Sequence, residues 1–297
     1  DGLQQLVSRF SHACKEFGLT ISLKKTEVMG QGTEHPPTIS IEGHTLAAVE
    51  NFTYLGSTIS NSVTLETEIS NRIAKAAAVM SKLHQRVWNN SSLTEKTKLR
   101  VYEACVLSTL LYSSETWTLY ARQERRLHSF HLRCLRRILN IHWQERIPEV
   151  EVLQRAGLKS MVSILRERRL RWLGHVRRMD PGRIPKDLLY GELVEGSRPT
   201  GRPRLRYKDV CKKDMKDIGI DIQSWETLAE DRPAWRHAVK SSVKKGEDAR
   251  NVALTEKRER RKNKQQQPQQ PSNFVCSKCY RDCHSRVGLY SHSRRCR

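Results

Sequence analysis

Apolar residues recur along most of this chain at three- and four-residue steps, the spacing that places side chains on one face of an α-helix. Gly18 directly follows the first such segment, and Thr94 precedes a later one, which suits a helix stop and an N-cap respectively. We expect helices over residues 3–17, 69–87, 94–110, 127–141, 162–179, 207–215 and 225–239. The pattern therefore predicts a mostly helical protein.

A different pattern fills the remainder of the first 60 or so residues. Apolar and polar residues alternate over 19–29, which is typical of a strand packed on one face. Residues 38–46, with Glu42 and Gly43 as the turn, are expected to form a hairpin, and 52–56 to form a short aromatic strand. The fold class that follows is α+β, with a small β part at the start of the chain.

The net charge of the chain indicates what kind of partner it binds. The chain of 297 residues carries 54 Lys plus Arg against 32 Asp plus Glu, a formal net charge of +22. Such an excess predicts a polyanionic partner, and both RNA and DNA are candidates. No run of about 18 apolar residues and no lipidation motif is present, so we do not expect a membrane partner. The oligomeric state is left open.

Arginines cluster in four segments that we expect to contact phosphate groups. For the first of these segments, over residues 125–137, the alternative is a solvated helix surface. The candidates are Arg125, Arg126, Arg133, Arg136 and Arg137; Arg168, Arg169, Arg171, Arg177 and Arg178; Arg202, Arg204 and Arg206 in a Pro/Gly-rich arm; and Arg286, Arg294 and Arg295 near the end. Trp172 lies among the second group, where it either stacks on a base or belongs to the core.

The last 24 residues contain the spacing Cys-x2-Cys-x12-His-x3-Cys, formed by Cys276, Cys279, His292 and Cys296. Thiolates and imidazoles at this spacing are typical of a zinc finger, and His292 and Cys296 are four residues apart, on one face of a helix. We therefore expect a Zn2+ site. The charged and Gln-rich segment 246–273 before it is expected to be a flexible linker.

The cysteines near the end of the chain also allow other assignments. Cys283 and His284 offer two further ligands, and a retroviral-type knuckle fits through His284 but then meets Leu289 in place of a cysteine. A disordered basic tail is also possible. Disulfides are disfavoured, because no secretory signal is seen and the other four cysteines lie in helical patterns. We expect an intracellular protein of the nucleus and cytoplasm, not a secreted one.

Two blocks near the start of the chain carry a resemblance, Gly18-Leu-Thr-Ile-Ser-Leu-Lys-Lys-Thr-Glu-Val-Met29 and Phe52-Thr-Tyr-Leu-Gly56. They resemble the strand after the catalytic aspartates and the primer grip of reverse transcriptases of non-LTR (LINE-type) retrotransposons. Blocks similar to the C-terminal region are Leu110-Leu-Tyr-Ser-Ser-Glu-Thr-Trp117, Arg169-Leu-Arg-Trp-Leu-Gly-His175, and Gly201-Arg-Pro-Arg204 with Trp225 downstream. The C-terminal finger also fits this family.

The resemblance implies a division of the chain into five parts. These are the end of a right-hand polymerase palm with a primer-grip-like hairpin (1–65), a helical thumb-like domain (66–145), a basic helical connector (146–245), the linker (246–273) and a CCHC zinc finger (274–297). It also implies that Lys25 lies near the incoming nucleotide, and that Phe52, Tyr54, Leu55 and Gly56 position the primer end.

The metal-binding aspartate motifs of such polymerases are absent, and the resemblance places the start of this sequence just after them. Because nucleotidyl transfer needs carboxylates for two Mg2+ ions, we expect no polymerase activity from this chain alone, and Mg2+ only in a full-length polymerase. The predicted role is to grip template RNA and target DNA during target-primed reverse transcription. The alternatives are a domesticated element-derived scaffold that binds a protein partner, and a decayed relic.

Overall fold

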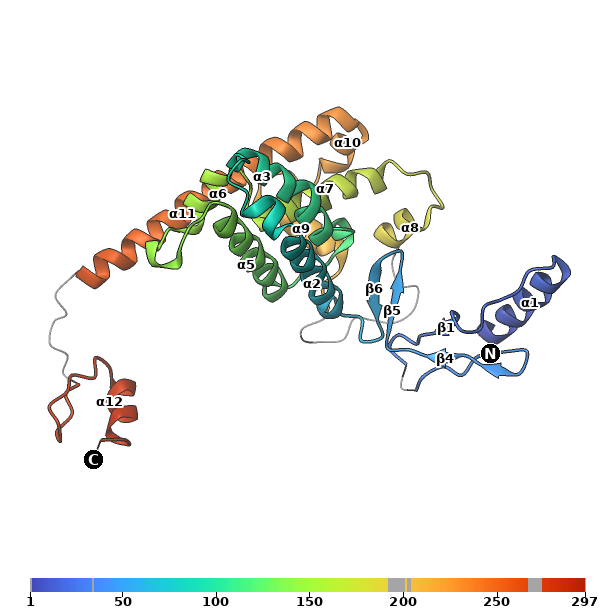
Figure 1. The fold of residues 1–297 in the computed structure, drawn as a ribbon, viewed down its shortest axis with the longest axis horizontal. Coiled ribbons are helices and arrows are strands. Elements are labelled where there is room, and N and C mark those ends of the chain that lie inside the picture. Colours follow the sequence, from blue (N-terminus) through green and yellow to red (C-terminus); the bar gives the residue numbers. More distant parts are fainter. Residues whose placement is uncertain (1, 34, 192–200, 202–203, 267–273, 297) are drawn as a thin grey trace. The chain divides into compact units, whose positions relative to one another are not determined.

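The computed structural model describes residues 2–33, 35–191, 201, 204–266 and 274–296, and divides into two compact units, 1–247 and 248–297. Figure 1 shows that helices dominate the described residues and that the strands among them lie near the start of the chain; one short bridge lies near its end. The expected fold class, mostly helical with a small β part, is confirmed at this level.

The first unit begins with one helix and three two-stranded sheets. These elements are α1 (Gly2–Glu16), β1 (Glu27–Val28), β2 (Ser40–Ile41), β3 (His44–Thr45), β4 (Ala47–Ala48), β5 (Asn51–Tyr54) and β6 (Ser57–Ser60). Strands β1 and β4 are parallel, whereas β2–β3 and β5–β6 are antiparallel hairpins. Gly18 has φ +66°, as expected for the residue that ends α1. A small core of Val28, Ile39, Ile41 and Leu46 holds this part together.

The predicted hairpin over 38–46 is confirmed, but the strand predicted over 19–29 is wrong for most of its length. Only its end, β1, is a strand. The amides of Lys25 and Thr26 both bond to the carbonyl of Ser22 at 3.0 Å, which closes a turn in the middle of the segment. The alternation of polar and apolar residues there reflects side chains of an irregular segment, such as Ile21 and Leu23, which pack on the small core.

A helical part follows the sheets. Its elements are α2 (Glu66–Lys82), the π-helical turn η1 (His84–Trp88), α3 (Glu95–Val101), the π-helical turn η2 (Tyr102–Leu107), α4 (Ser108–Leu110), the short 3-10 turn η3 (Ser114–Thr116), α5 (Ala121–Ile138), a second 3-10 turn η4 (Trp143–Glu145) and α6 (Glu149–Ala156). Thr94 caps α3 as predicted, since its hydroxyl accepts a hydrogen bond from the amide of Thr97. Residues Ile69, Tyr102, Leu127 and Val152 form part of the shared core.

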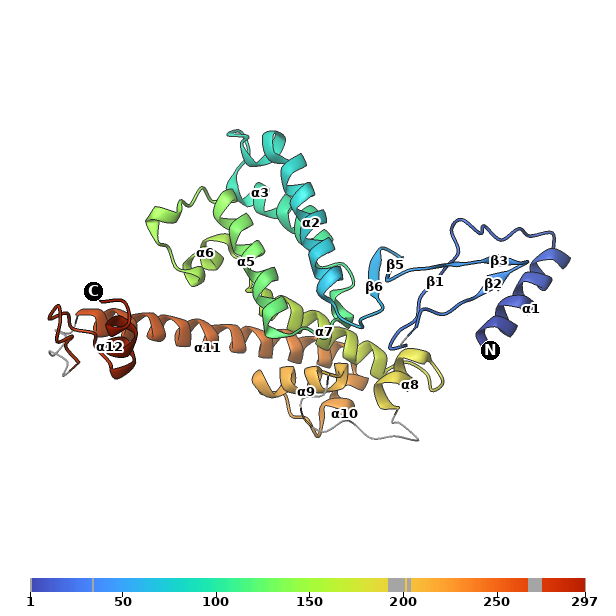
Figure 2. The ribbon, with the colours of Figure 1, turned by 90° about the horizontal axis from the view of Figure 1, so that it is seen from below.

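Helix α7 (Met161–Arg177) connects this core to a second one. Its first turns place Met161 and Leu165 in the core of α2 and α5, while Leu170 and Leu173 belong to the next core. That second core also takes residues from α8 (Ile184–Tyr190), α9 (Tyr207–Asp217), α10 (Trp225–Glu230) and the start of α11 (Arg232–Gln266). Figure 2 shows α9 and α10 beside α7, in agreement with their contacts.

Three features of this region differ from the sequence prediction. Helices α6 and α8 were not expected, and the helical segment predicted over 225–239 is two helices separated at Asp231. The break has a simple cause, because Pro233 has no amide proton and fits the first turn of a new helix rather than the middle of an old one.

The segment predicted as a flexible linker also differs. Residues 246–266 continue α11 as a helix, and 267–273 lie outside the described residues. The helical stretch is rich in Lys, Arg, Glu, Ala and Gln, which have high helix propensity even without a buried face. Beyond it, the second unit contains α12 (Arg286–Ser293) and a bridge between Val275 and Asp282.

Candidate metal centre and basic surfaces

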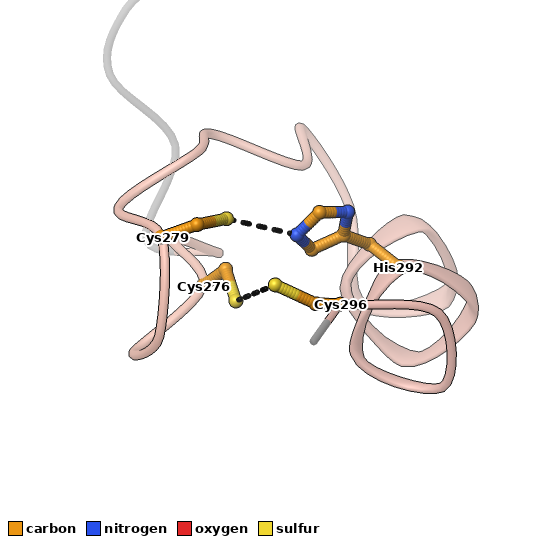
Figure 3. Close-up of side chains that lie close together, drawn as sticks. All are labelled: Cys276, Cys279, His292 and Cys296. Carbon is orange, nitrogen blue, oxygen red and sulfur yellow. Dashed lines mark hydrogen bonds between the residues drawn. The ribbon is translucent and has the colours of Figure 1, made fainter.

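The four predicted zinc ligands converge in the second unit (Figure 3). The ligand atoms of Cys276, Cys279, His292 and Cys296 all lie within 4.8 Å of one another. Cys276 Sγ is 3.9 Å from Cys296 Sγ, and Cys279 Sγ is 3.0 Å from His292 Nε2. A tetrahedral Zn2+ with bonds of about 2.0–2.3 Å requires ligand atoms separated by roughly 3–4 Å. The donor set of three sulfurs and one imidazole nitrogen therefore fits Zn2+.

The local fold explains why these residues meet. The amide of Tyr280 donates to the carbonyl of Cys276 at 2.9 Å, which closes the turn that carries the first two cysteines. Ser285 caps α12 through its hydroxyl, which accepts from the amide of Gly288. The amide of Cys296 donates to the carbonyl of His292 at 2.8 Å. This bond continues the helical turn past the end of α12, so that the side chains of His292 and Cys296 lie on the same side of it.

Gly288 has a steric role in this arrangement. A Cβ at this position would lie 2.3 Å from the carbonyl oxygen of Cys283, a distance that real contacts do not show. Because the carbonyl belongs to the backbone just before α12, it cannot move aside without shifting the loop that precedes the helix. The glycine thus lets the helix start close to the turn that carries the cysteines.

Backbone amides also favour the thiolate form of one ligand. Hydrogen bonds from the amides of Cys279 and Lys278 lower the pKa of Cys276 to about 6. Zinc binds thiolates rather than thiols, so this arrangement reduces the cost of losing the proton.

The two alternative ligands lie outside the cluster. Cys283 Sγ is directed to the carbonyl of Arg281 at 3.5 Å, and His284 Nδ1 lies 3.4 Å from a carboxylate oxygen of Asp282. Leu289, at the fourth position of a knuckle, is part of α12. The geometry favours the longer finger over the knuckle.

The arginines of α5 are only partly available to a ligand. Arg125 and Arg133 are exposed and line a shallow hollow with Arg122 and Arg126. Arg126 is already paired with Glu66 and also donates to Ser70. Of the other two arginines predicted on this helix, Arg137 contacts the ring of His84, and Arg136 is half-buried.

The arginines of α7 divide into two sets. Arg168, Arg171 and Arg178 line one open pocket, together with Arg232 and Arg236 of α11. The last two were not predicted from the sequence, although their four-residue spacing at the start of a helix places them on one face. Arg177 forms ion pairs with Glu226 and Glu230 instead.

The expectation that Arg169 contacts phosphate is wrong. Its side chain is only 1% exposed, and Nε donates to Asp214 at 2.8 Å while Nη2 lies 3.6 Å from Glu124. Burial opposes the charge, but the carboxylate of Asp214 more than compensates and raises the pKa of Arg169. The helical spacing of α7 puts this arginine on the inner face, where it holds α5 and α9 to α7 through ion pairs.

The other predicted arginines lie in loops and in the second unit. Arg202 lies outside the described residues; Arg204 is exposed, and Arg206 is paired with Asp209. Arg286, Arg294 and Arg295 are exposed on or just after α12, and the Arg294 guanidinium lies 5.1 Å from the ring centre of Tyr290.

The residues assigned to the nucleotide and primer by resemblance lie in the sheet region. Lys25 is exposed in the turn before β1, and Phe52 is half-buried in β5. Leu55 and Gly56 form the turn of the β5–β6 hairpin, with φ of +47° and +83°, and Tyr54 precedes them. Leu55 is 75% exposed, so the tip of this hairpin presents an apolar side chain to solvent.

Side chains of the helical part hold this hairpin turn in place. Arg72 of α2 donates to the carbonyl of Gly56 at 2.7 Å, and Tyr112 Oη donates to the carbonyl of Leu55 at 3.1 Å. The guanidinium of Arg72 lies 4.6 Å from the ring centre of Tyr112 and is paired with the buried carboxylate of Glu68. Glu68 in turn accepts a hydrogen bond from the amide of Thr58 in β6.

The site and fold together define a basic, mostly helical protein with a Cys3His cluster of the zinc-finger type. Over 252 residues the chain is 26% identical to a putative uncharacterized transposon-derived protein of Caenorhabditis elegans, with 81% of this chain and 88% of the relative covered. This similarity is consistent with a transposable-element origin. No family model and no solved structure matches the chain. Within the described residues, no helix is long and apolar enough to cross a membrane.

Proposed function

We propose that this chain is the nucleic-acid-binding C-terminal portion of a non-LTR retrotransposon reverse transcriptase, which grips template RNA and target DNA. The observation that carries the proposal is the convergence of Cys276, Cys279, His292 and Cys296 into one Cys3His cluster. The net charge of +22 supports it, as does the similarity to a transposon-derived protein. The five-part division of the chain, from palm remnant to finger, is part of this proposal.

The exposed arginines supply the affinity in this proposal. Arg125 and Arg133 on α5, Arg171 on α7 and Arg294 on the finger are exposed, and each adds a phosphate contact without reading a base. The hairpin tip at Leu55 and Gly56 contacts the primer end only in the full-length polymerase, where upstream carboxylates hold Mg2+. This chain alone grips nucleic acid but does not extend it.

The test is nucleic-acid affinity across a salt series, measured with structured RNA and duplex DNA, on the intact chain and on Cys276→Ser/Cys279→Ser. Zinc content is measured on both. We expect log affinity for duplex DNA to fall with log salt at a slope of about −0.9 per phosphate contact, and the double variant to lose zinc together with part of the affinity. Cys105→Ser, an exposed thiol of the first unit, is the matched control. Weak binding that does not respond to salt would overturn the proposal.

A second function is favoured by one feature of the finger. Val275, Val287, Leu289 and Tyr290 line an apolar hollow, and the side chains of Val287 and Tyr290 are 75% and 61% exposed. Such a surface suits a protein partner, as in a domesticated scaffold. Binding to a protein through this surface would respond little to salt, so the same salt series separates the two functions.

A further inference from the structure

One open pocket of the first unit combines many arginines with aromatic rings. It has a volume of about 510 Å3 and lies between α7 and the start of α11, with Glu115 of η3 at its edge. Five arginines line it, Arg168, Arg171, Arg178, Arg232 and Arg236, and Glu115 is the one acidic residue among the described residues that line it. Trp172, His175 and Trp235 complete its wall.

Most of this positive charge is not compensated by the protein. Glu115 is paired with Arg168 at 3.2 Å. Among the described residues, Arg171, Arg232 and Arg236 have no carboxylate within ion-pair distance, and Arg178 donates only to the carbonyl of Ala229, at 2.6 Å. Burial, together with the nearby charge of Arg232, lowers the pKa of Arg178. Like charges held together in this way are stabilised by an anion that binds between them.

The arginines are held at fixed places around the pocket. Arg171 lies in α7, and Arg178 is the residue that caps its C-terminal end, about two turns further on; Arg232 and Arg236 are one turn apart on α11. The two helices are joined by the buried indole of Trp235, whose Nε1 donates to the carbonyl of Leu170 at 2.9 Å. The four guanidinium groups therefore surround the pocket from two rigid elements, an arrangement that suits more than one phosphate oxygen.

The aromatic wall selects among anions. Trp172 is half-buried, and its ring centre lies 5.1 Å from that of His175, which is exposed. An inorganic phosphate cannot stack on these rings, whereas a nucleic-acid base stacks on an indole with a substantial gain in affinity. The volume also lies within the range of about 300–1,000 Å3 that holds small organic ligands. In a duplex the bases are paired and stacked inside the helix, so only an unpaired base reaches such a wall.

We propose that this pocket binds an unpaired nucleotide of a single-stranded nucleic acid, with the base against Trp172 and the phosphates on Arg171, Arg178, Arg232 and Arg236. The proposal deepens the nucleic-acid-binding function proposed above and rests on it. It explains the second part of the Arg-Leu-Arg-Trp-Leu-Gly-His block of α7, since Arg171, Trp172 and His175 line the pocket while Gly174 leaves room for Trp235.

The test is a comparison of labelled single strands on the full chain. The probes are a short oligouridylate, an oligothymidylate of equal length, a strand of the same length made of abasic sugar–phosphate units, and a blunt duplex. Trp172→Leu should weaken binding of the base-bearing strands by about 5- to 150-fold and leave the abasic strand unchanged. Trp172→Phe keeps an aromatic face and should retain most of the affinity.

The arginines are tested separately, because Trp172 also packs on the second core and Trp172→Leu could perturb the fold. Arg171 and Arg236 are exposed, so Arg171→Gln/Arg236→Gln should leave folding intact. This variant should weaken all single strands and reduce the salt slope by about 1.4, at 0.7 per lost phosphate contact. Arg86→Gln/Arg100→Gln makes the same change of charge at exposed positions elsewhere and should have a smaller effect that does not depend on the probe.

The outcomes separate the two proposals. If the intact chain binds oligonucleotides but neither pocket variant differs from the matched control, the pocket proposal is overturned and the general function stands. If Trp172→Leu weakens the abasic strand as much as the base-bearing strands, the base does not stack there and the pocket proposal is also overturned. If the intact chain binds none of the probes, both proposals fail.

Discussion

A Cβ atom on Gly174 would lie 2.2 Å from Nε1 of Trp235. Helix α7 therefore has no side chain where the indole crosses it, and this close approach allows Trp235 to donate to the carbonyl of Leu170. Trp235 is 1% exposed and stands beside Trp225, with ring centres 6.0 Å apart. The contact sets the distance between α7 and α11, and with it the shape of the basic pocket.

Gly174→Ala should therefore destabilise the first unit. The added methyl group forces the indole away, with a cost of about 1–3 kcal/mol for overpacking and a further ~1 kcal/mol if the indole hydrogen bond is lost. Urea unfolding followed by circular dichroism measures the change in the free energy of unfolding. Gly2→Ala is the control, because a Cβ there meets nothing within 4 Å. Equal stability of the two variants would contradict the close contact.

Arg169 and Arg171 give a second prediction, because they are two residues apart on α7 but differ in role. Arg169 is buried between Asp214 and Glu124, whereas Arg171 is exposed in the pocket. Arg169→Gln removes one of the two arginines that pair with the buried carboxylate of Asp214, the other being Arg166, and should reduce the free energy of unfolding by about 1.5–3 kcal/mol. Arg171→Gln should change it by less than about 0.5 kcal/mol. Urea unfolding of both variants is the measurement, and a reversed order would contradict the assignment.

His131 makes the stability depend on pH. It is fully buried, Tyr102 Oη lies 2.7 Å from its Nδ1, and burial lowers its pKa from 6.5 to about 4. Below about pH 6.5 the imidazole of His131 is protonated in the unfolded chain, whereas in the folded chain it stays neutral until about pH 4. Acid therefore favours unfolding. The loss between these values is on the order of 3 kcal/mol, at about 1.4 kcal/mol for each unit of pKa shift.

The measurement for His131 is a difference between variants, since other groups also titrate in this range. The free energy of unfolding is measured from pH 7.5 or so down to about pH 4.5 in the wild type and in His131→Gln. The wild type should lose more stability on acidification than the variant. His12→Gln, at an exposed position of α1, should follow the wild type. Parallel pH curves for wild type and His131→Gln would show that His131 is not the group responsible.

Much of this fold could be predicted because its local signals agree with its packing. Thr94 precedes an apolar run of helical period, and the structure has both the cap and the helix there. The four ligands of the finger were predictable because their spacing alone fixes a turn followed by a helix. In both cases residues close in sequence determine the result.

Other features depend on partners distant in sequence. Arg169 and Arg171 look alike in the sequence, and only Asp214, which is 45 residues further along, makes one of them internal. Arg232 and Arg236 belong to the pocket because α11 crosses α7 at Gly174. The strand predicted over 19–29 failed because alternation identifies a buried face without showing that a partner strand exists.

Leu55 provides a prediction about backbone strain. It occupies the left-handed region with φ +47° at the first position of a two-residue hairpin turn, and its side chain is 75% exposed. Asparagine tolerates this conformation and Asn-Gly is the favoured sequence for such a turn. Leu55→Asn should raise the free energy of unfolding by up to about 1 kcal/mol, as measured by urea unfolding. Ile59→Asn, on the exposed face of β6, is a control for the loss of an exposed apolar side chain and should not stabilise.

The last prediction distinguishes the ligands of the finger from the cysteine beside them. Cys279→Ser removes one of four convergent ligands and should abolish stoichiometric zinc binding, whereas Cys283→Ser should retain it, because Cys283 lies outside the cluster. Chelation of zinc from the wild type should unfold the second unit, since in zinc fingers the free energy of metal binding is largely the free energy of folding. The amide signals of residues 274–296 in NMR spectra report this loss, and those of the first unit should not change. Zinc loss in Cys283→Ser with retention in Cys279→Ser would contradict the predicted ligand set, because the metal would then be bound by Cys283 and not by Cys279.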